Sequence, residues 1–289
     1  MNQKTKGILC ILASAFCFAV MNTFVRLSGD LPSIQKAFFR NLVAIFFAVA
    51  VLRKNQIKIG WPKGSGKILL LRSFFGTMGI ICNFYAVDHL VLSDASMLNK
   101  MSPFFVILFS FLILKERLSL VQGLSVVTAF AGSLFIIKPV FSNMELVPSM
   151  IGLCGGLGAG IAYTMVRILG KKGVKGPVIV FFFSTFSCVV TLPYLIVDYA
   201  YMKPIQIFYL ICAGLAASGG QFGITAAYCY APAKEISVYD YSQIIFAAVI
   251  GFFVFGQKPD FLSVIGYIII CGTAVAMFLY NNRKTEVIS

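Results

Sequence analysis

The amino-acid sequence predicts an all-α integral membrane protein whose ten transmembrane helices form two inverted repeats of five. Three observations support this prediction: an apolar composition, ten apolar stretches of membrane-spanning length, and a pattern that recurs halfway along the chain. Of the 289 residues, 59% are hydrophobic and only 12% are charged, and the mean hydropathy is +0.91. This composition indicates that a lipid bilayer is the solvent of most of the chain.

The ten stretches follow one another with short connections, which leave no space for a separate soluble domain. A helix needs about 20 apolar residues to cross the roughly 30 Å hydrocarbon layer. In chain order, the predicted spans are 7–28, 33–53, 68–88, 92–114, 119–138, 148–170, 175–198, 204–229, 235–256 and 260–281. The first span is too long for a signal peptide and no clean small-residue cleavage site follows it, so we expect it to stay in the membrane.

The distribution of charge predicts the orientation. The net charge is +14, and Lys and Arg near the ends of spans gather on the cytoplasmic side of a membrane. If the N-terminus is cytoplasmic, sixteen of these basic residues lie inside and five lie outside. The basic excess is therefore a topology signal and not a sign of nucleic-acid binding. It predicts a multi-pass protein of the cell membrane with both termini inside.

The two halves of the chain, residues 1–141 and 142–289, align at an offset of 141 residues. This offset places the segment 94–99 on 235–240 and the segment 114–117 on 255–258. Each match is weak, but the shared offset makes chance an unsatisfactory explanation. An odd number of spans in each half turns the second half upside down, an arrangement known from secondary transporters.

A motif runs from the second to the fifth span. Pro103 precedes Leu114-Lys115-Glu116-Arg117, Gly123 follows it, and Phe39-Arg40-Asn41 stands in the second span. These residues resemble the drug/metabolite transporter superfamily and, within it, the ten-helix EamA-type carriers, along nearly the whole chain. The resemblance implies a small-molecule carrier without naming its substrate. The second half departs from the motif, because Gln257 stands where glutamate is expected.

Ionisable residues inside spans are costly and usually face a protein interior or an aqueous cavity. Lys100 lies about eight residues into the fourth span and Asp240 about five residues into the ninth, in repeat-equivalent segments. We expect both to line one central cavity, with a vertical gap of about 10 Å that leaves direct pairing open. Arg40 in the second span is expected either to join helices or to belong to a gate.

Pro103 directs attention to the polar residues before it. A proline cannot donate to the carbonyl four residues back, which here belongs to Asn99. That carbonyl, with Ser96, Asn99 and Lys100, is a candidate ligand set, and a packing kink is the alternative. Glu116 at the end of this span is predicted to be structural.

Further candidate contacts with a substrate are amide and tyrosine side chains in the spans that the family resemblance places around the substrate path: Asn22, Asn83, Tyr163, Gln221, Tyr228, Tyr239 and Tyr241. A tyrosine in a span can instead sit at the membrane interface or bond a neighbouring helix. Glycines that recur every four residues predict close helix packing, and they are Gly152, Gly156 and Gly160 in the sixth span with Gly219 and Gly223 in the eighth.

These features favour a carrier that moves a small polar metabolite by alternating access through a central cavity. A cation and an anion on one cavity suit a zwitterion such as an amino acid, which is the substrate we expect first. An anionic metabolite, held by Lys100 with Arg40 or Arg72, is the alternative. Direction of transport, oligomeric state and coupling stay open, and Asp240 is the deep acid that proton coupling would require.

Other classes of function have less support. All eight cysteines lie in predicted spans at no metal-like spacing, and no cofactor-binding motif is present. A membrane-embedded enzyme would need a general base, for which His89 beside Asp88 is a weak candidate. A flippase for lipid-linked substrates is a further alternative. We therefore expect no enzyme and no cofactor. The expected partners are the metabolite and the lipid bilayer, nucleic acid is not expected, and a homodimer stays open.

Overall fold

The computed structural model describes residues 3–114, 119–137, 145–230 and 237–286, and all regular structure in these ranges is helical. The elements are α1 (Gln3–Leu27), α2 (Ser33–Lys54), α3 (Gly66–His89), α4 (Leu92–Asn99), α5 (Ser102–Leu114), α6 (Leu120–Ile137), α7 (Leu146–Lys171), α8 (Gly176–Val197), α9 (Pro204–Tyr230), the 3₁₀ segment η1 (Ser237–Tyr241), α11 (Ser242–Phe255) and α12 (Phe261–Glu286).

The described helices have the length and the surface of a membrane protein. Eight stretches are long and apolar enough to span a bilayer, and two shorter apolar helices are Gly123–Ile136 and Tyr239–Phe255. Large apolar side chains point outward: Phe46, Val197 and Phe253 are 69%, 87% and 79% exposed, whereas Arg40 is 2% exposed. This distribution, apolar outside and charged inside, suits a protein surrounded by lipid.

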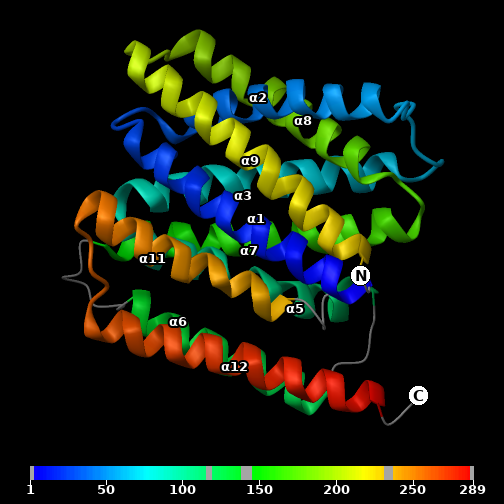
Figure 1. Ribbon diagram of the computed structural model, residues 1–289, viewed down its shortest axis with the longest axis vertical. Helices are drawn as coiled ribbons and strands as arrows, with labels where there is room; N and C mark the ends of the chain where they lie inside the picture. Colours follow the sequence, from blue (N-terminus) through cyan, green and yellow to red (C-terminus); the bar gives the residue numbers. More distant parts are fainter. Residues whose placement is uncertain (1–2, 115–118, 138–144, 231–236, 287–289) are drawn as a thin grey trace.

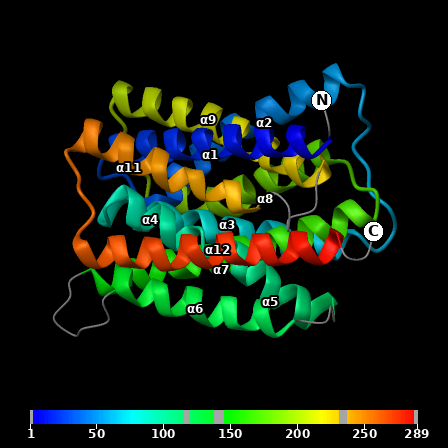
Figure 2. The ribbon, with the colours of Figure 1, turned by 60° about the horizontal axis from the view of Figure 1, so that its bottom comes forward.

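The helices lie side by side with their axes running across the view in Figure 1. Helices α6 and α12 form one side, α2, α8 and α9 form the other, and α1, α3 and α7 lie between them. Figure 2 shows the same separation after a turn, with α5 and α6 on one side and α2 and α9 on the other.

The packing joins the two halves of the chain. Helix α1 packs on α9 and α3 packs on α7, while α2 packs on α8 and α6 packs on α12. Helix α5 likewise packs on α7, and α11 packs on α1. If each helix is exchanged for the one five spans further along, the same set of pairs returns. Each half therefore buries its surface mainly against the other half.

Glycines allow the closest of these approaches, as the sequence predicts. A methyl group on Gly156 of α7 would lie 2.5 Å from the carbonyl oxygen of Leu98, and one on Gly160 would lie 2.4 Å from Cβ of Phe105. On α9, a methyl group on Gly223 would lie 3.0 Å from the carbonyl oxygen of Cys10. These positions bring α7 against the fourth span and α9 against α1, so the glycine stripes serve packing.

Candidate functional site

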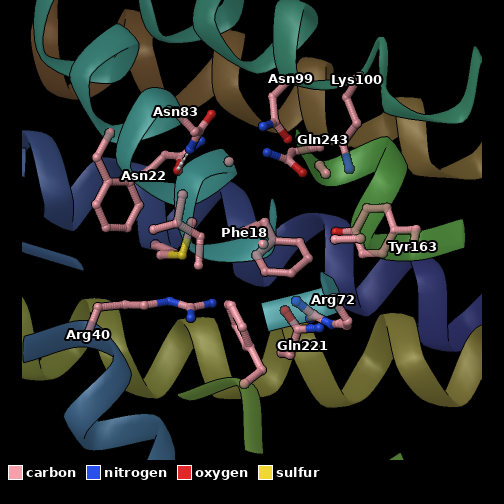
Figure 3. A pocket seen from close by; sticks show the side chains of 18 residues that line it. Phe18, Asn22, Arg40, Arg72, Asn83, Asn99, Lys100, Tyr163, Gln221 and Gln243 are labelled. Atoms are coloured by element: carbon pink, nitrogen blue, oxygen red, sulfur yellow. Dashed lines mark hydrogen bonds between the residues drawn. The ribbon is translucent and has the colours of Figure 1, made fainter. Parts of the chain in front are cut away.

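A buried cavity lies at the contact between the two halves, with a volume of about 70 Å³ open to water (Figure 3). A water molecule needs roughly 10–15 Å³ of such space, so the cavity has room for about five. Its polar lining from the first half is Asn22, Arg40, Arg72, Asn83, Asn99 and Lys100, and from the second half it is Tyr163, Gln221 and Gln243. Both halves therefore contribute hydrogen-bonding groups to one space.

The fourth span is broken where it reaches this cavity. Helix α4 ends at Asn99 and α5 begins at Ser102, so Lys100 lies in the break. Pro103 is buried in the first turn of α5, a position where its missing N–H costs little. The sequence predicts a disturbance at this proline, and the structure places the interruption on the residues just before it. Broken helices at mid-membrane are typical of substrate sites in transporters.

The ninth span is also irregular near this cavity. Its first described turn is the 3₁₀ segment η1, which holds Asp240, and the α-helical part begins at Ser242. The Nζ of Lys100 lies 2.7 Å from Oδ2 of Asp240, and the two side chains are only 4% and 2% exposed. The gap of about 10 Å expected from helical depths is closed, because a 3₁₀ segment rises faster per residue than an α-helix and the lysine side chain is long.

Two arginines occupy the opposite wall of the cavity, on α2 and α3 (Figure 3). Arg40 and Arg72 are each 2% exposed. The ring of Phe183 on α8 contacts both, with its centroid 6.0 Å from Cζ of Arg40 and 4.0 Å from Cζ of Arg72. Among the described residues, no carboxylate forms an ion pair with either arginine. The aromatic face stabilises the two cations in part but does not neutralise them.

The position of each guanidinium is set by its neighbours. Arg40 donates from Nη1 to Oδ1 of Asn41, and Asn41 donates in turn to Oγ of Ser187 over 2.8 Å. Arg72 lies against the next turn of its own helix, because a methyl group on Gly76 would sit 2.2 Å from Nη1 of Arg72. Glycine at 76 therefore provides the space in which the Arg72 guanidinium lies.

Amide groups complete the lining. Asn83 donates from Nδ2 to Oδ1 of Asn22 over 3.2 Å. Within the described part of the chain, several buried polar atoms around the cavity have no hydrogen-bond partner, namely Nδ2 of Asn22, Nε of Arg40, Nε of Arg72, Oδ1 of Asn83 and Oε1 of Gln243. Buried polar atoms are costly unless water or a ligand bonds them. Their concentration here favours a polar occupant.

Most of the residues expected from the sequence come together at this cavity, where their role in binding stays a prediction. Asn22, Asn83, Asn99, Lys100, Tyr163, Gln221 and Arg40 line it. Asp240 takes part through Lys100. The remaining candidates lie elsewhere or outside the description: Ser96 is fully buried off the lining, Tyr239 packs on Phe278, Tyr241 packs on Phe104, the side chain of Tyr228 is not among those described, and Glu116 lies outside the described residues.

Among the lining residues that the sequence analysis did not name, Gln243, Phe18 and Phe183 lie beside the charged or amide groups. The sequence does contain a signal for Gln243, because an amide side chain inside an apolar span is costly to bury, as it is for the other amide candidates. Phe18 and Phe183 carry no such signal, because a phenylalanine on the cavity looks like one that faces lipid. The fold shows that Phe183 contacts Arg40 and Arg72 and that Phe18 contacts Lys100.

A second polar cluster lies where α1 and α3 end and α2 begins, on the side of the membrane that is predicted to be outside. Lys36 lies 2.6 Å from Oδ1 of Asp88, and Arg26 donates to the carbonyls of Val87 and Leu90 at the end of α3. Nδ1 of His89 lies 2.8 Å from the carbonyl oxygen of Tyr85. Asp88 is thus engaged by a lysine, which argues against a His89–Asp88 catalytic pair.

Gln257, the departure from the expected glutamate, has a clear partner. Its Oε1 accepts a hydrogen bond of 3.1 Å from the backbone N–H of Leu92. Leu92 is the first residue of α4, whose first N–H groups have no partner within the helix. An amide oxygen can accept this bond as a carboxylate can, so the interaction does not require the acid.

Comparison with known proteins places the chain in a family. The EamA-like transporter family matches residues 5–138 and again residues 150–279. The pseudopaline exporter CntI of Pseudomonas aeruginosa is 30% identical over 273 residues, which cover 94% of this chain and 95% of that protein. The S-adenosylmethionine uptake transporter of Rickettsia prowazekii is 23% identical over 296 residues, covering 99% and 97%.

Further comparisons agree. Human solute carrier family 35 member G1 is 26% identical over 283 residues, covering 93% of this chain and 78% of that protein. A solved crystal structure has a TM-score of 0.71 at 13% identity over 96% of this chain and 98% of its own, which shows the same fold. The two matched segments and the named relatives make this chain a multi-span membrane transporter of the cell membrane, and not an enzyme. The chain belongs to the EamA-like transporter family.

Proposed function

We propose that this protein is a secondary carrier that moves a small anionic metabolite by alternating access through the cavity at the contact of its two halves. The observation that carries the proposal is the pair of buried arginines, Arg40 and Arg72, neither of which has a described carboxylate as its partner. Relatives are named for an exported and an imported cargo, so the family leaves both substrate and direction open.

The charges around the cavity favour an anion. Lys100 is neutralised by Asp240, which leaves the two arginines as the excess. An ion in a low-dielectric interior carries an effective penalty of several kcal/mol unless an opposite charge compensates it. An anionic substrate supplies that compensation, and Arg offers a planar donor fork that matches a carboxylate.

A zwitterionic amino acid is the second candidate. Its expected partners were Lys100 and Asp240, but these two side chains are engaged with each other. The amino acid would place its carboxylate on an arginine and its ammonium on the Oδ1 of Asp240, which has no hydrogen-bond partner. Asp240 itself does not line the cavity. This arrangement requires the ion pair to turn toward the substrate, whereas an anion uses the cavity as it stands.

The transport cycle would involve the two halves, 1–141 and 142–289, as oppositely inserted units that rock about the cavity. Three features support this proposal. The packing pairs are exchanged when the halves are exchanged. The fourth and ninth spans are both irregular beside the cavity, at Lys100 and Asp240. Glycine contacts between α7 and the fourth span allow close surfaces to slide.

The test is transport by purified protein in proteoliposomes. A thermal-shift screen in detergent first selects compounds, because a ligand at a hundredfold excess over its Kd stabilises the folded form by about 2.7 kcal/mol. Organic anions, amino acids and organic cations are then compared as labelled substrates. Uptake of anions that depends on protein content supports the proposal. Uptake confined to cations or uncharged compounds contradicts it, and uptake confined to amino acids favours the second candidate.

A further inference from the structure

The geometry points to a substrate with two acidic groups, of the short dicarboxylate class, that bridges Arg40 and Arg72. This inference rests on the proposed function and deepens it, since two guanidinium charges without a described carboxylate need two negative charges for full compensation. Both arginines are on the cavity lining and both are 98% buried, as the 2% exposure of each implies. Each buried guanidinium charge would therefore be stabilised by an anionic group of its own.

The two guanidinium groups lie within reach of one small molecule. Their Cζ atoms lie 6.0 Å and 4.0 Å from the centroid of the same Phe183 ring, so the separation between them cannot exceed the sum, about 10 Å. They come from different helices, α2 and α3, and Phe183 comes from α8. A linear molecule with an acid at each end can contact both cations while its carbon chain lies against the ring.

Each guanidinium keeps donors for such a ligand. The structure gives Arg40 one hydrogen bond, to the neighbouring Asn41. Nε of Arg40 and Nε of Arg72 are buried without a hydrogen-bond partner in the described part of the chain. A guanidinium has five N–H donors in a fixed fork, and one edge can bind a carboxylate through two bonds. Two such forks define two carboxylate positions.

Neighbouring residues orient the Arg40 guanidinium and leave space for the Arg72 guanidinium. Asn41 links Arg40 to Ser187 on α8, and the absence of a side chain at Gly76 provides the space for Arg72. Nothing comparable surrounds the exposed Arg53 at the end of α2. Asn41 therefore orients the Arg40 guanidinium, and a pre-organised group loses less entropy when it binds.

The opposite wall is suited to the uncharged part of a ligand. Asn22, Asn83 and Gln243 carry buried polar atoms without hydrogen-bond partners, and they face the arginines across the cavity in Figure 3. Hydroxyl or amide groups on the carbon chain would bond these side chains. Lys100 adds no net positive charge to the cavity, because it forms an ion pair with Asp240.

The experiment compares dicarboxylates with their half-amides. Oxalate, malonate, succinate and glutarate, each beside its monoamide, are titrated into the purified full-length protein by calorimetry at one ionic strength. We expect at least one diacid to bind tenfold or more tightly than its half-amide, which keeps size and shape but loses one charge. Arg40→Gln and Arg72→Gln should each reduce this ratio to less than twofold, and Arg53→Gln should leave it unchanged.

Each result has a distinct meaning. If no diacid exceeds its half-amide, or if the ratio survives in both Arg40→Gln and Arg72→Gln, the two-point site is wrong. If the half-amides are nevertheless transported, the proposed carrier of anions stands without it. If neither diacids nor half-amides bind and cations do, the proposed function fails as well. Arg72→Lys separates folding from recognition, because it keeps the charge and should restore part of the ratio.

Discussion

The ammonium group of Lys100 and the carboxylate of Asp240 lie 2.7 Å apart, although 140 positions of the chain separate them and they belong to different halves. Both side chains are almost fully buried. The pair therefore joins the break in the fourth span to the first turn of the ninth, directly beside the cavity. It ties the two irregular spans together and removes one positive charge from the lining.

The first prediction concerns this ion pair. Removing one partner of a buried pair leaves an uncompensated charge and typically costs about 3–5 kcal/mol. We expect Lys100→Met and Asp240→Asn each to lower the thermal midpoint in detergent strongly. The double variant should recover much of that loss, because no isolated charge is left. Equal midpoints for wild type and both single variants would contradict the role of the pair.

The second prediction concerns Gly76. Alanine at this position would place its Cβ 2.2 Å from Nη1 of Arg72, the mobile end of a long side chain. We expect Gly76→Ala to move the guanidinium and weaken anion binding tenfold or more, with a small change in thermal midpoint. A calorimetric titration measures the binding and a thermal shift measures the stability. Unchanged affinity would show that Arg72 does not need this space.

The third prediction concerns the packing of α7. Alanine at Gly156 would place its Cβ 2.5 Å from the carbonyl oxygen of Leu98, which is backbone and cannot move aside easily. We expect Gly156→Ala to separate α7 from the fourth span, costing about 1–3 kcal/mol as overpacked sites do. Gly170→Ala on the same helix is the matched control, because no atom lies within 4 Å of its added methyl group. Equal stability of the two variants would exclude this close contact.

The fold and part of the cavity could be predicted from the sequence, for separable reasons. The length of an apolar stretch is a local property, and it predicts the bounds of α2 and α8 to within a few residues. Charged residues in apolar spans are conspicuous, which is why Lys100, Asp240 and Arg40 were found. The contact between Lys100 and Asp240 could not be predicted from the sequence, because it depends on how the two halves pack. The position of Phe183 on the cavity could not be predicted for the same reason.

The fourth prediction concerns Gln257. Its Oε1 accepts the N–H of Leu92 at the start of α4, and losing such a cap costs about 0.5–2 kcal/mol. We expect Gln257→Leu to lower the thermal midpoint. Gln257→Glu should keep it or raise it, because a carboxylate favours a helix N-terminus. A loss of stability in Gln257→Glu as large as in Gln257→Leu would mean that the cap is not what position 257 provides.

The fifth prediction concerns coupling. Without an anion, the cavity holds two buried arginine charges that no described carboxylate compensates, so the empty carrier should reorient slowly. We expect proteoliposomes loaded with the substrate anion to take up labelled anion several-fold faster than unloaded ones. Replacing Arg72 with glutamine should reduce this acceleration. Equal initial rates with and without internal anion would indicate simple facilitated diffusion.

Labelling the cavity from one side of the membrane at a time is the sharpest test of alternating access between the two halves. Gln221→Cys on the cavity and Ala227→Cys on the same helix, buried away from it, are made in a protein without the eight native cysteines. A membrane-impermeant thiol reagent is then applied from one side of oriented vesicles at a time. If access alternates through this cavity, the cysteine at 221 reacts from each side and the cysteine at 227 reacts from neither. Reaction at 221 from one side only, or from neither, would contradict alternating access through this cavity.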